Sequence, residues 1–374
     1  LDPRLHPRGV QLDVVLAGDL GEQEPETDAL LRAFPQLFGR RRLLIAALLD
    51  LGTREETTLM PGRTHMQLAM PSSIGLWAAA WAEECLEHLE LLDSVARLVN
   101  RSPLGAAAGY GPPLTLDRPY AATLMGFARP VTTSLGAIQS RGMTEARVLS
   151  VLDDIGITLS RIATDLILFA LPEFGYISLP VELCTGSSIM PQKQNPDLLE
   201  LLRSGSARLS AAHRLVRNVV RCAPGGYNRD GQDSKAPLLE SFSLAGQMLR
   251  VAARAVSGLG VNHSRLNAAM APELFATDAA MARVEAGESF RDAYRAVAAD
   301  TAAVAVPEDR EVFRRRQTLG APGNPGTGLL QERLTGVWAG LKASRDHHRN
   351  AVRGLIGTGT LVPGAGRGPQ PAAP

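Results

Sequence analysis

The stretch Gly186–Pro196, GSSIMPQKQNP, interrupts a chain that is otherwise rich in Ala, Leu and Arg. It places one glycine, two serines, one lysine, one asparagine and two prolines in eleven positions. A helical pattern follows at 196–221, with Asn195 as the expected N-cap, Pro196 in the first helical position and Asp197 at the positive end of the helix dipole. Because free N–H groups at a helix start attract anions, the stretch predicts either an anion-binding loop or a plain capping loop ahead of a long helix.

Four more long segments carry the same apolar spacing as the helix behind this loop, while alternating strand patterns are scarce. The segment 72–99 opens with a Pro-Ser-Ser cap signal, and 144–170 fits a buried helix. The remaining two segments are 26–58 and 237–258. Long helices joined by polar loops predict an all-α fold, a long central helical bundle with five long helices per chain.

The long helices are expected to form one central domain over residues 26–262. GLGVNHS then interrupts the pattern, and shorter helical segments predict a smaller C-terminal helical domain at 263–350. The Gly/Pro-rich residues 351–374 are expected to form a disordered tail. The shorter segments are 264–272, 276–286 and 288–303.

Composition narrows the class of protein. A formal net charge of +1, from 39 basic and 38 acidic side chains, gives no general attraction to nucleic acid or membrane. No signal-peptide pattern is present, and no apolar run is long enough to span a bilayer. Cys85, Cys184 and Cys222 are far apart and lack metal-ligand spacing, so we expect reduced thiols in a cytoplasmic protein without a metal site.

Lysine is rare, and its positions are informative. Among 39 basic residues only Lys193, Lys235 and Lys342 are lysines. Two of them lie in polar loops, GSSIMPQKQNP and GGYNRDGQDSK (225–235). Arginine would serve a solvated surface equally well, so the bias favours contact with an anion. The anion at the first of these loops could be a carboxylate. The loop would hold this carboxylate while one of its serines acts on the neighbouring C–H group.

A third polar loop, MPGRTHMQ (60–67), contains a histidine. A lone histidine is more often structural than catalytic. Its polar neighbours Thr64 and Gln67 favour a site here, where His65 could protonate a leaving nitrogen or hold a carboxylate. The imidazole would need an orienting partner, and Glu200 is the candidate.

The segment TGSSIMPQKQNPDLLELLR resembles the signature of the fumarase/aspartase superfamily, G-S-S-x-M-P-x-K-x-N. With MPGRTHMQLAMP and YNRDGQDSK in the same order, the chain is most similar to the argininosuccinate lyases, from about Leu5 to about Asp300. The resemblance implies cleavage of the C–N bond of an N-substituted aspartate, with argininosuccinate giving arginine and fumarate as the best guess. It also implies a small-molecule substrate, no metal or organic cofactor, and a cytoplasmic homotetramer. Its twenty-helix bundle would have active sites shared between three chains.

The resemblance implies roles for the residues around the serine loop. Ser187 would remove the Cβ proton of the substrate. Lys193 and Asn195 would stabilise the aci-carboxylate that forms. His65, paired with Glu200, would act as the acid, on the side of the site where the leaving nitrogen is protonated.

The other polar residues are implied to bind the substrate. Thr64 would contact a substrate carboxylate, and Gln67 belongs to the same polar group. Tyr227, Gln232 and Lys235 match positions that bind the substrate in argininosuccinate lyases.

Two stretches near the N-terminus depart from the family pattern. The family has a further region before the point where this chain begins, so residues 1–25 are expected to be a remnant of it. LHPRGVQLD places Val10, Gln11 and Leu12 where the family has Ser-Arg-Asn, which removes polar contacts to the succinyl part of the substrate.

The loop TTSLGAIQSRG (132–142) has also lost acidic groups. Thr133 replaces Asn, while Gly136, Ser140 and Gly142 each replace Asp, and Arg63 elsewhere replaces a usual Tyr. These changes leave two alternatives open. One is a related C–N lyase for a different amine-bearing succinyl substrate in specialised metabolism, and the other is a catalytically inert structural paralogue.

Overall fold

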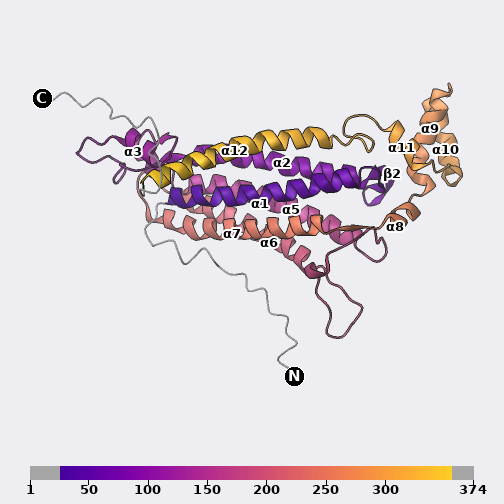
Figure 1. Ribbon diagram of the computed structural model, residues 1–374, viewed down its shortest axis with the longest axis horizontal. Coiled ribbons are helices and arrows are strands. Elements are labelled where there is room, and N and C mark those ends of the chain that lie inside the picture. Colours follow the sequence, from indigo (N-terminus) through magenta and orange to yellow (C-terminus); the bar gives the residue numbers. More distant parts are fainter. Residues whose placement is uncertain (1–25, 356–374) are drawn as a thin grey trace.

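The computed structural model describes residues 26–355, and most of that length is helical (Figure 1). Five long helices pack side by side, and consecutive long helices run in opposite directions. The predicted all-α bundle is therefore confirmed. The five helices are α1 (Glu26–Arg54), α2 (Ile74–Val99), α5 (Met143–Phe169), α6 (Asp197–Arg221) and α7 (Lys235–Ser257).

One contiguous apolar core holds these helices together. Leu48 of α1, Leu89 of α2 and Leu249 of α7 are each 0% exposed within it. Such side chains recur every three or four residues because that spacing places them on one face of a helix. The predicted cap of α2 is confirmed, since Ser73 accepts a hydrogen bond from the backbone N–H of Leu76 at 3.0 Å.

The start of α6 differs from its prediction. Asn195 is not the N-cap, because Pro196 takes that position and no side chain caps the helix. Asn195 instead pairs with Thr185 through the backbone in an isolated antiparallel bridge. Its peptide groups close a loop, which leaves the residue one position too early to cap α6.

A sixth long helix, α12 (Thr327–Leu355), was not predicted. It runs back along the bundle against α1 and α2, where Arg333 pairs with Glu90 at 2.7 Å (Figure 1). Residues 327–350 thus pack on the bundle, whereas we had expected them in the smaller C-terminal domain. Residues 351–355, expected to begin a disordered tail, form the last part of the same helix.

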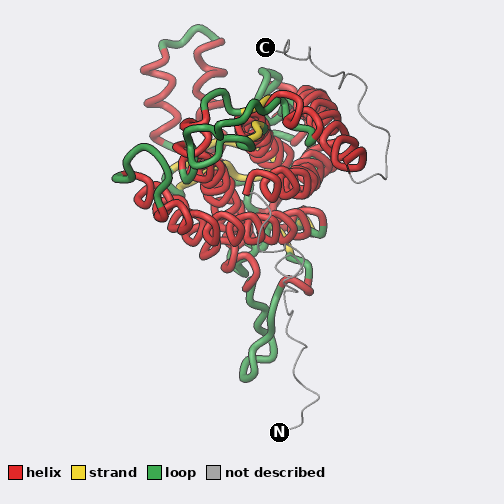
Figure 2. The backbone as a smooth tube through the Cα atoms, turned by 90° about the vertical axis from the view of Figure 1, so that its left-hand side faces the viewer, coloured by secondary structure: helices red, strands yellow, loops and turns green. Residues whose placement is uncertain are grey.

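Between α7 and α12 the chain forms short helices at one end of the bundle, and α9 and α10 form a helical hairpin there (Figures 1 and 2). The predicted shorter helices are present, and α11 was not expected. They are α8 (His263–Ala268), α9 (Ala276–Glu285), α10 (Phe290–Ala299) and α11 (Asp309–Arg315), with 3-10 turns at Pro272–Phe275 and Thr301–Ala303. None of the described helices combines the length and apolar character that a membrane crossing requires.

Strands are few and short in the described part of the chain, where they form three two-stranded sheets. The antiparallel hairpin β1 (Leu59–Thr64) and β2 (Gln67–Ser73) joins α1 to α2. Opposite it, α3 (Arg118–Leu124) and α4 (Ser134–Gln139) cover the other end of the bundle. The remaining pairs are parallel β3 (Arg101–Ser102) with β4 (Arg129–Pro130), and antiparallel β5 (Ile177–Ser178) with β6 (Gly260–Val261).

The three polar loops occupy both ends of the bundle. The β1–β2 hairpin and the loop 186–195 lie at the end where α6 begins. The loop 225–235 follows the far end of α6. With 25 residues at 1.5 Å each, α6 separates its two flanking loops by about 37 Å.

Candidate active site

The serine loop, residues 186–195, is closed at its base. The backbone N–H of Thr185 donates to the carbonyl of Asn195 at 3.0 Å, and the N–H of Asn195 donates back at 2.8 Å. The Thr185 hydroxyl also donates to the carboxylate of Asp197. Beyond this base the loop projects away from the bundle, and Ile189 within it is 86% exposed (Figures 1 and 2). The loop is thus fixed at its ends and presents its tip to the outside.

Two backbone N–H groups point at the side-chain oxygen of Ser187. Its Oγ accepts hydrogen bonds from the N–H groups of Ile189, at 3.3 Å, and Met190, at 3.1 Å. Such donors stabilise negative charge on the oxygen, which a serine needs in order to act as a base. Lys193 follows in a turn closed by its own N–H to the Met190 carbonyl at 3.1 Å. The loop therefore combines a serine oxygen with an exposed cation.

The hairpin carrying His65 has an unusual turn. His65 and Met66 connect β1 to β2 as a two-residue loop, with φ of 52° and 64°. Turns of this kind normally use Asn-Gly or similar pairs, because other residues pay about 1–2 kcal/mol each in the left-handed region. Thr64 and Gln67 pair directly across the turn. The three predicted residues Thr64, His65 and Gln67 are therefore presented together on an exposed, strained tip.

The predicted partner of His65 makes no hydrogen bond or ion pair with it within the described residues of one chain. Glu200 lies on the exposed side of the first turn of α6. The pairing stays a prediction for contacts between chains.

At the opposite end, the third loop forms its own small arrangement. The Gln232 amide donates to the hydroxyl of Tyr227 at 3.3 Å, and the guanidinium of Arg141 lies 5.1 Å from the Tyr227 ring centre. The hydrogen bond from Gln232, followed by the contact with Arg141, lowers the pKa of the Tyr227 hydroxyl below its usual value. Lys235 begins α7 directly after the 3-10 turn Arg229–Ser234.

A cavity of about 280 Å³ adjoins this third loop. It lies between the end of α6, the loop after it and the segment 138–143, and both Arg141 and Asp230 line it. Sequence reasoning missed Arg141. The signal available was its position in the Gly/Ser-rich loop 132–142, where an arginine kept among lost acidic residues suggests a specific contact.

Two of the departures in the 132–142 loop, at Gly142 and Thr133, have a visible structural setting. Gly142 has φ of 76°, and a β-carbon there would lie 2.0 Å from Cγ1 of Val220. Thr133 caps α4 by accepting from the N–H of Gly136 at 3.0 Å. An aspartate at position 142 would require the packing against Val220 to be rebuilt. The departures at Val10–Leu12 lie outside the described residues.

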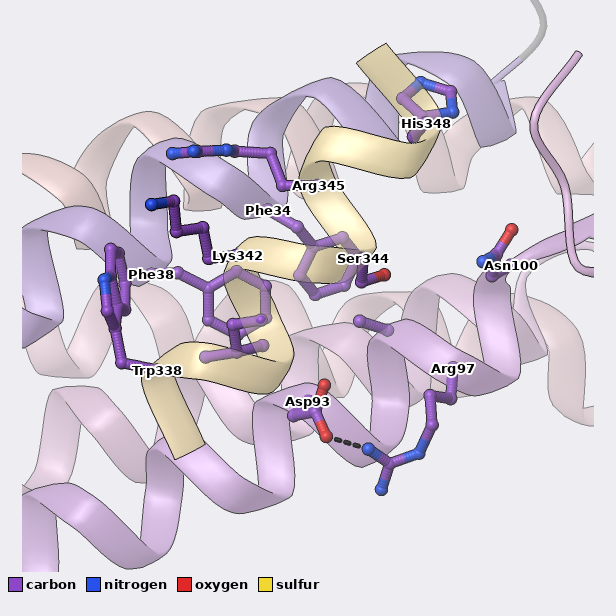
Figure 3. A pocket seen from close by; sticks show the side chains of 12 residues that line it. Phe34, Phe38, Asp93, Arg97, Asn100, Trp338, Lys342, Ser344, Arg345 and His348 are labelled. Atoms are coloured by element: carbon purple, nitrogen blue, oxygen red, sulfur yellow. Dashed lines mark ion pairs between the residues drawn. The ribbon is translucent and has the colours of Figure 1, made fainter. Parts of the chain in front are cut away.

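A second cavity, of about 70 Å³, lies between α1, α2 and α12 (Figure 3). Phe34, Phe38 and Trp338 form its apolar side, and Asp93 and Arg97 form an ion pair at its rim. None of the predicted site residues lines it. Across the described residues, no group of three or more His, Cys, Asp and Glu side chains is placed to hold a metal ion.

The known proteins that this chain resembles in sequence and in structure are lyases. Residues 29–210 match the family model described as Lyase. Argininosuccinate lyase from Sorangium cellulosum is 42% identical over 77% of this chain and 67% of its own, and that from Xanthomonas euvesicatoria is 38% identical over 79% and 67%. The crystal structure of EDDS lyase in complex with formate superposes with a TM-score of 0.72 at 22% identity, covering 89% of this chain and 72% of that one.

The helical bundle, the serine loop and these matches define a lyase, and the chain belongs to the fumarase/aspartase superfamily. Argininosuccinate lyase from Xylella fastidiosa is matched at 41% identity over 63% of its length, so the chain spans about two thirds of its curated relatives. Within the superfamily the chain is an argininosuccinate-lyase-like carbon–nitrogen lyase by its similarity.

Proposed function

We propose that this chain catalyses β-elimination from an N-substituted aspartate, with argininosuccinate giving arginine and fumarate. Ser187 takes the Cβ proton, and the electron pair enters the adjacent carboxylate to give the aci-carboxylate. That intermediate collapses to the carbon–carbon double bond of fumarate as the Cα–N bond breaks. His65, oriented by Glu200, gives a proton to the departing nitrogen.

The observation that carries this proposal is the environment of Ser187. Two backbone N–H groups point at its oxygen, at 3.3 and 3.1 Å. Lys193 and Asn195 follow on the same loop, where a cation and an amide would stabilise the developing negative charge. A serine is a poor base in water, so closure of the exposed loop over the substrate would be required to exclude solvent.

The remaining predicted residues are proposed to bind the substrate. Thr64 and Gln67 would contact a substrate carboxylate from the hairpin tip, while Tyr227, Gln232 and Lys235 would bind the amine-bearing part. The separation of about 37 Å along α6 supports a site assembled from several chains, because one chain cannot bring Ser187 and Tyr227 together. We therefore propose a homotetramer with active sites shared between three chains.

The second candidate is a related C–N lyase that releases a different amine. The observation that favours it is the contact of Gly142 with Val220, since this loop cannot accommodate the family's acidic residue as it stands. The succinyl half and the proton-abstracting chemistry would be the same. Only the amine-bearing part of the substrate would differ.

Ultraviolet detection of fumarate tests both candidates. Wild-type protein incubated with argininosuccinate should release fumarate, and Ser187→Ala should lower kcat by at least about 100-fold, while Ser188→Ala serves as the neighbouring control. Fumarate from another N-succinyl amine but none from argininosuccinate would select the second candidate. Full activity in Ser187→Ala would refute the mechanism.

A further inference from the structure

The strained hairpin tip is held by a residue outside the predicted site. Arg63 is the last residue but one of β1, and its Nη1 donates to the carbonyl oxygen of Met66 at 2.9 Å. Met66 is the second residue of the turn, with φ of 64°. The hydrogen bond therefore spans His65 and fixes the peptide group between Met66 and Gln67.

Arg63 also ties this tip to the body of the protein. Its guanidinium carbon lies 5.0 Å from the centre of the Phe174 ring. Phe174 stacks in turn on Tyr176, with centroids 5.3 Å apart and an interplanar angle of 28°, and Tyr176 is only 4% exposed. Both aromatic residues follow the end of α5. The guanidinium thus bridges an exposed turn and an anchored aromatic pair.

An arginine is better suited to making both contacts at once than a lysine or a tyrosine. Its planar fork stacks on a ring through its face while an N–H at its edge donates to a carbonyl. A lysine ammonium is a compact charge without such a plane, and the tyrosine that the family pattern has at this position carries no cation. The substitution therefore gives this chain a contact that the family pattern does not.

We propose that Arg63 is a positioning residue that holds His65 in the orientation needed for proton transfer. The assignment of His65 to proton transfer rests on the proposed function. The geometric part, that Arg63 holds the turn, stands on the described contacts alone.

The test compares Arg63→Met with a matched control, Arg42→Met. Arg42 is also an exposed arginine, and its guanidinium carbon lies 4.7 Å from the centre of the Trp338 ring. This contact lies on the surface formed by α1 and α12. In hydrogen-exchange mass spectrometry, Arg63→Met should raise exchange across residues 64–68 about tenfold, and Arg42→Met should leave it unchanged. The NMR signal of the His65 ring, assigned with His65→Gln, should move only in Arg63→Met.

Activity measurements then address the proton-transfer part. Arg63→Met should lower kcat about tenfold with a smaller change in KM and shift the pH–rate profile, and Arg63→Lys should recover only part of the loss. Unchanged exchange and an unchanged His65 signal in Arg63→Met would overturn the proposal, as would a wild-type pH–rate profile in an active variant. If the wild-type protein released no fumarate from any N-succinyl amine, the proposed function would fail. The exchange and NMR results would still decide whether Arg63 positions His65.

Discussion

Gly142 lies directly against Val220, so close that a β-carbon at position 142 would approach Cγ1 of Val220 to 2.0 Å. This contact joins the segment before α5 to the last turn of α6. It gives a structural reason for a glycine where the family pattern has an acidic residue, since φ is 76° and a β-carbon would overlap the side chain of Val220.

The first prediction concerns this contact. Gly142→Ala should lower the free energy of unfolding by about 2–4 kcal/mol, from left-handed backbone strain and overpacking together. Gly287→Ala is the control, because Gly287 also has a positive φ but has nothing within 4 Å of a β-carbon, so it should cost only the strain. Adding Val220→Ala to Gly142→Ala should recover part of the loss in urea denaturation. Equal costs at 142 and 287 would contradict the overpacking argument.

The second prediction concerns assembly of the site from several chains. Ser187→Ala and Tyr227→Ala each alter one end of the bundle, and each alone should lose most activity. Mixed oligomers made by co-expression should recover about one quarter of wild-type activity, since random assembly leaves that share of sites with both residues intact. Absence of any recovery, with mixed oligomers verified by mass spectrometry, would argue against shared sites.

The base of the serine loop gives the third prediction. Thr185→Val keeps the branched side chain but removes the hydroxyl that donates to Asp197. The loop should then open more readily, with faster amide exchange across 186–195 and a fall in kcat of about threefold to tenfold. Thr164→Val, which removes a hydroxyl bonded to the Ser160 carbonyl within α5, should leave both quantities unchanged.

The fourth prediction is an acid-dependent loss of stability at His88. Thr158 donates its hydroxyl proton to Glu84 at 2.7 Å, so Nε2 of His88 donates to Thr158 at 2.8 Å. Burial, with a smaller effect of Arg41, lowers the pKa of His88 from 6.5 to about 4. Between these values the unfolded chain binds more protons than the native state, so the free energy of unfolding rises with pH.

As the pH falls from 6.5 towards 4, the free energy of unfolding should decrease by about 1–2 kcal/mol because of His88, after screening by solvent. His88→Gln keeps an amide donor for Thr158 but cannot take up the proton, so guanidinium denaturation should show a flatter pH dependence. His347→Gln, at an exposed position on α12, should retain the wild-type slope. A wild-type slope in His88→Gln would place the acid sensitivity elsewhere.

The long helices were predictable because burial on one face repeats at helical spacing, as Leu48 and Leu89 illustrate. The helix α12 was missed because Gly328, Gly336 and Gly340 weaken its pattern, and packing on α1 and α2 stabilises it instead. Intrinsic preference alone therefore could not show that residues 327–355 form a helix.

The candidate site was predictable to a different degree. Motif residues such as Ser187 were visible in the sequence, while the interactions that position them were not. The left-handed turn at His65 carries none of the usual glycine or asparagine signals, and Asn195 looked like a helix cap because its backbone pairing with Thr185 depends on the folded loop. These features arise from contacts between segments, which local sequence patterns do not encode.

The position of α6 between two of the polar loops has a consequence for how the proposed enzyme would respond to concentration. If each site needs loops from opposite ends of different chains, an isolated chain is an incomplete catalyst. Dilution below the dissociation constant of the oligomer would then abolish turnover while every chain stayed folded. The specific activity would depend on how much protein is present, and low abundance alone would keep the chemistry switched off.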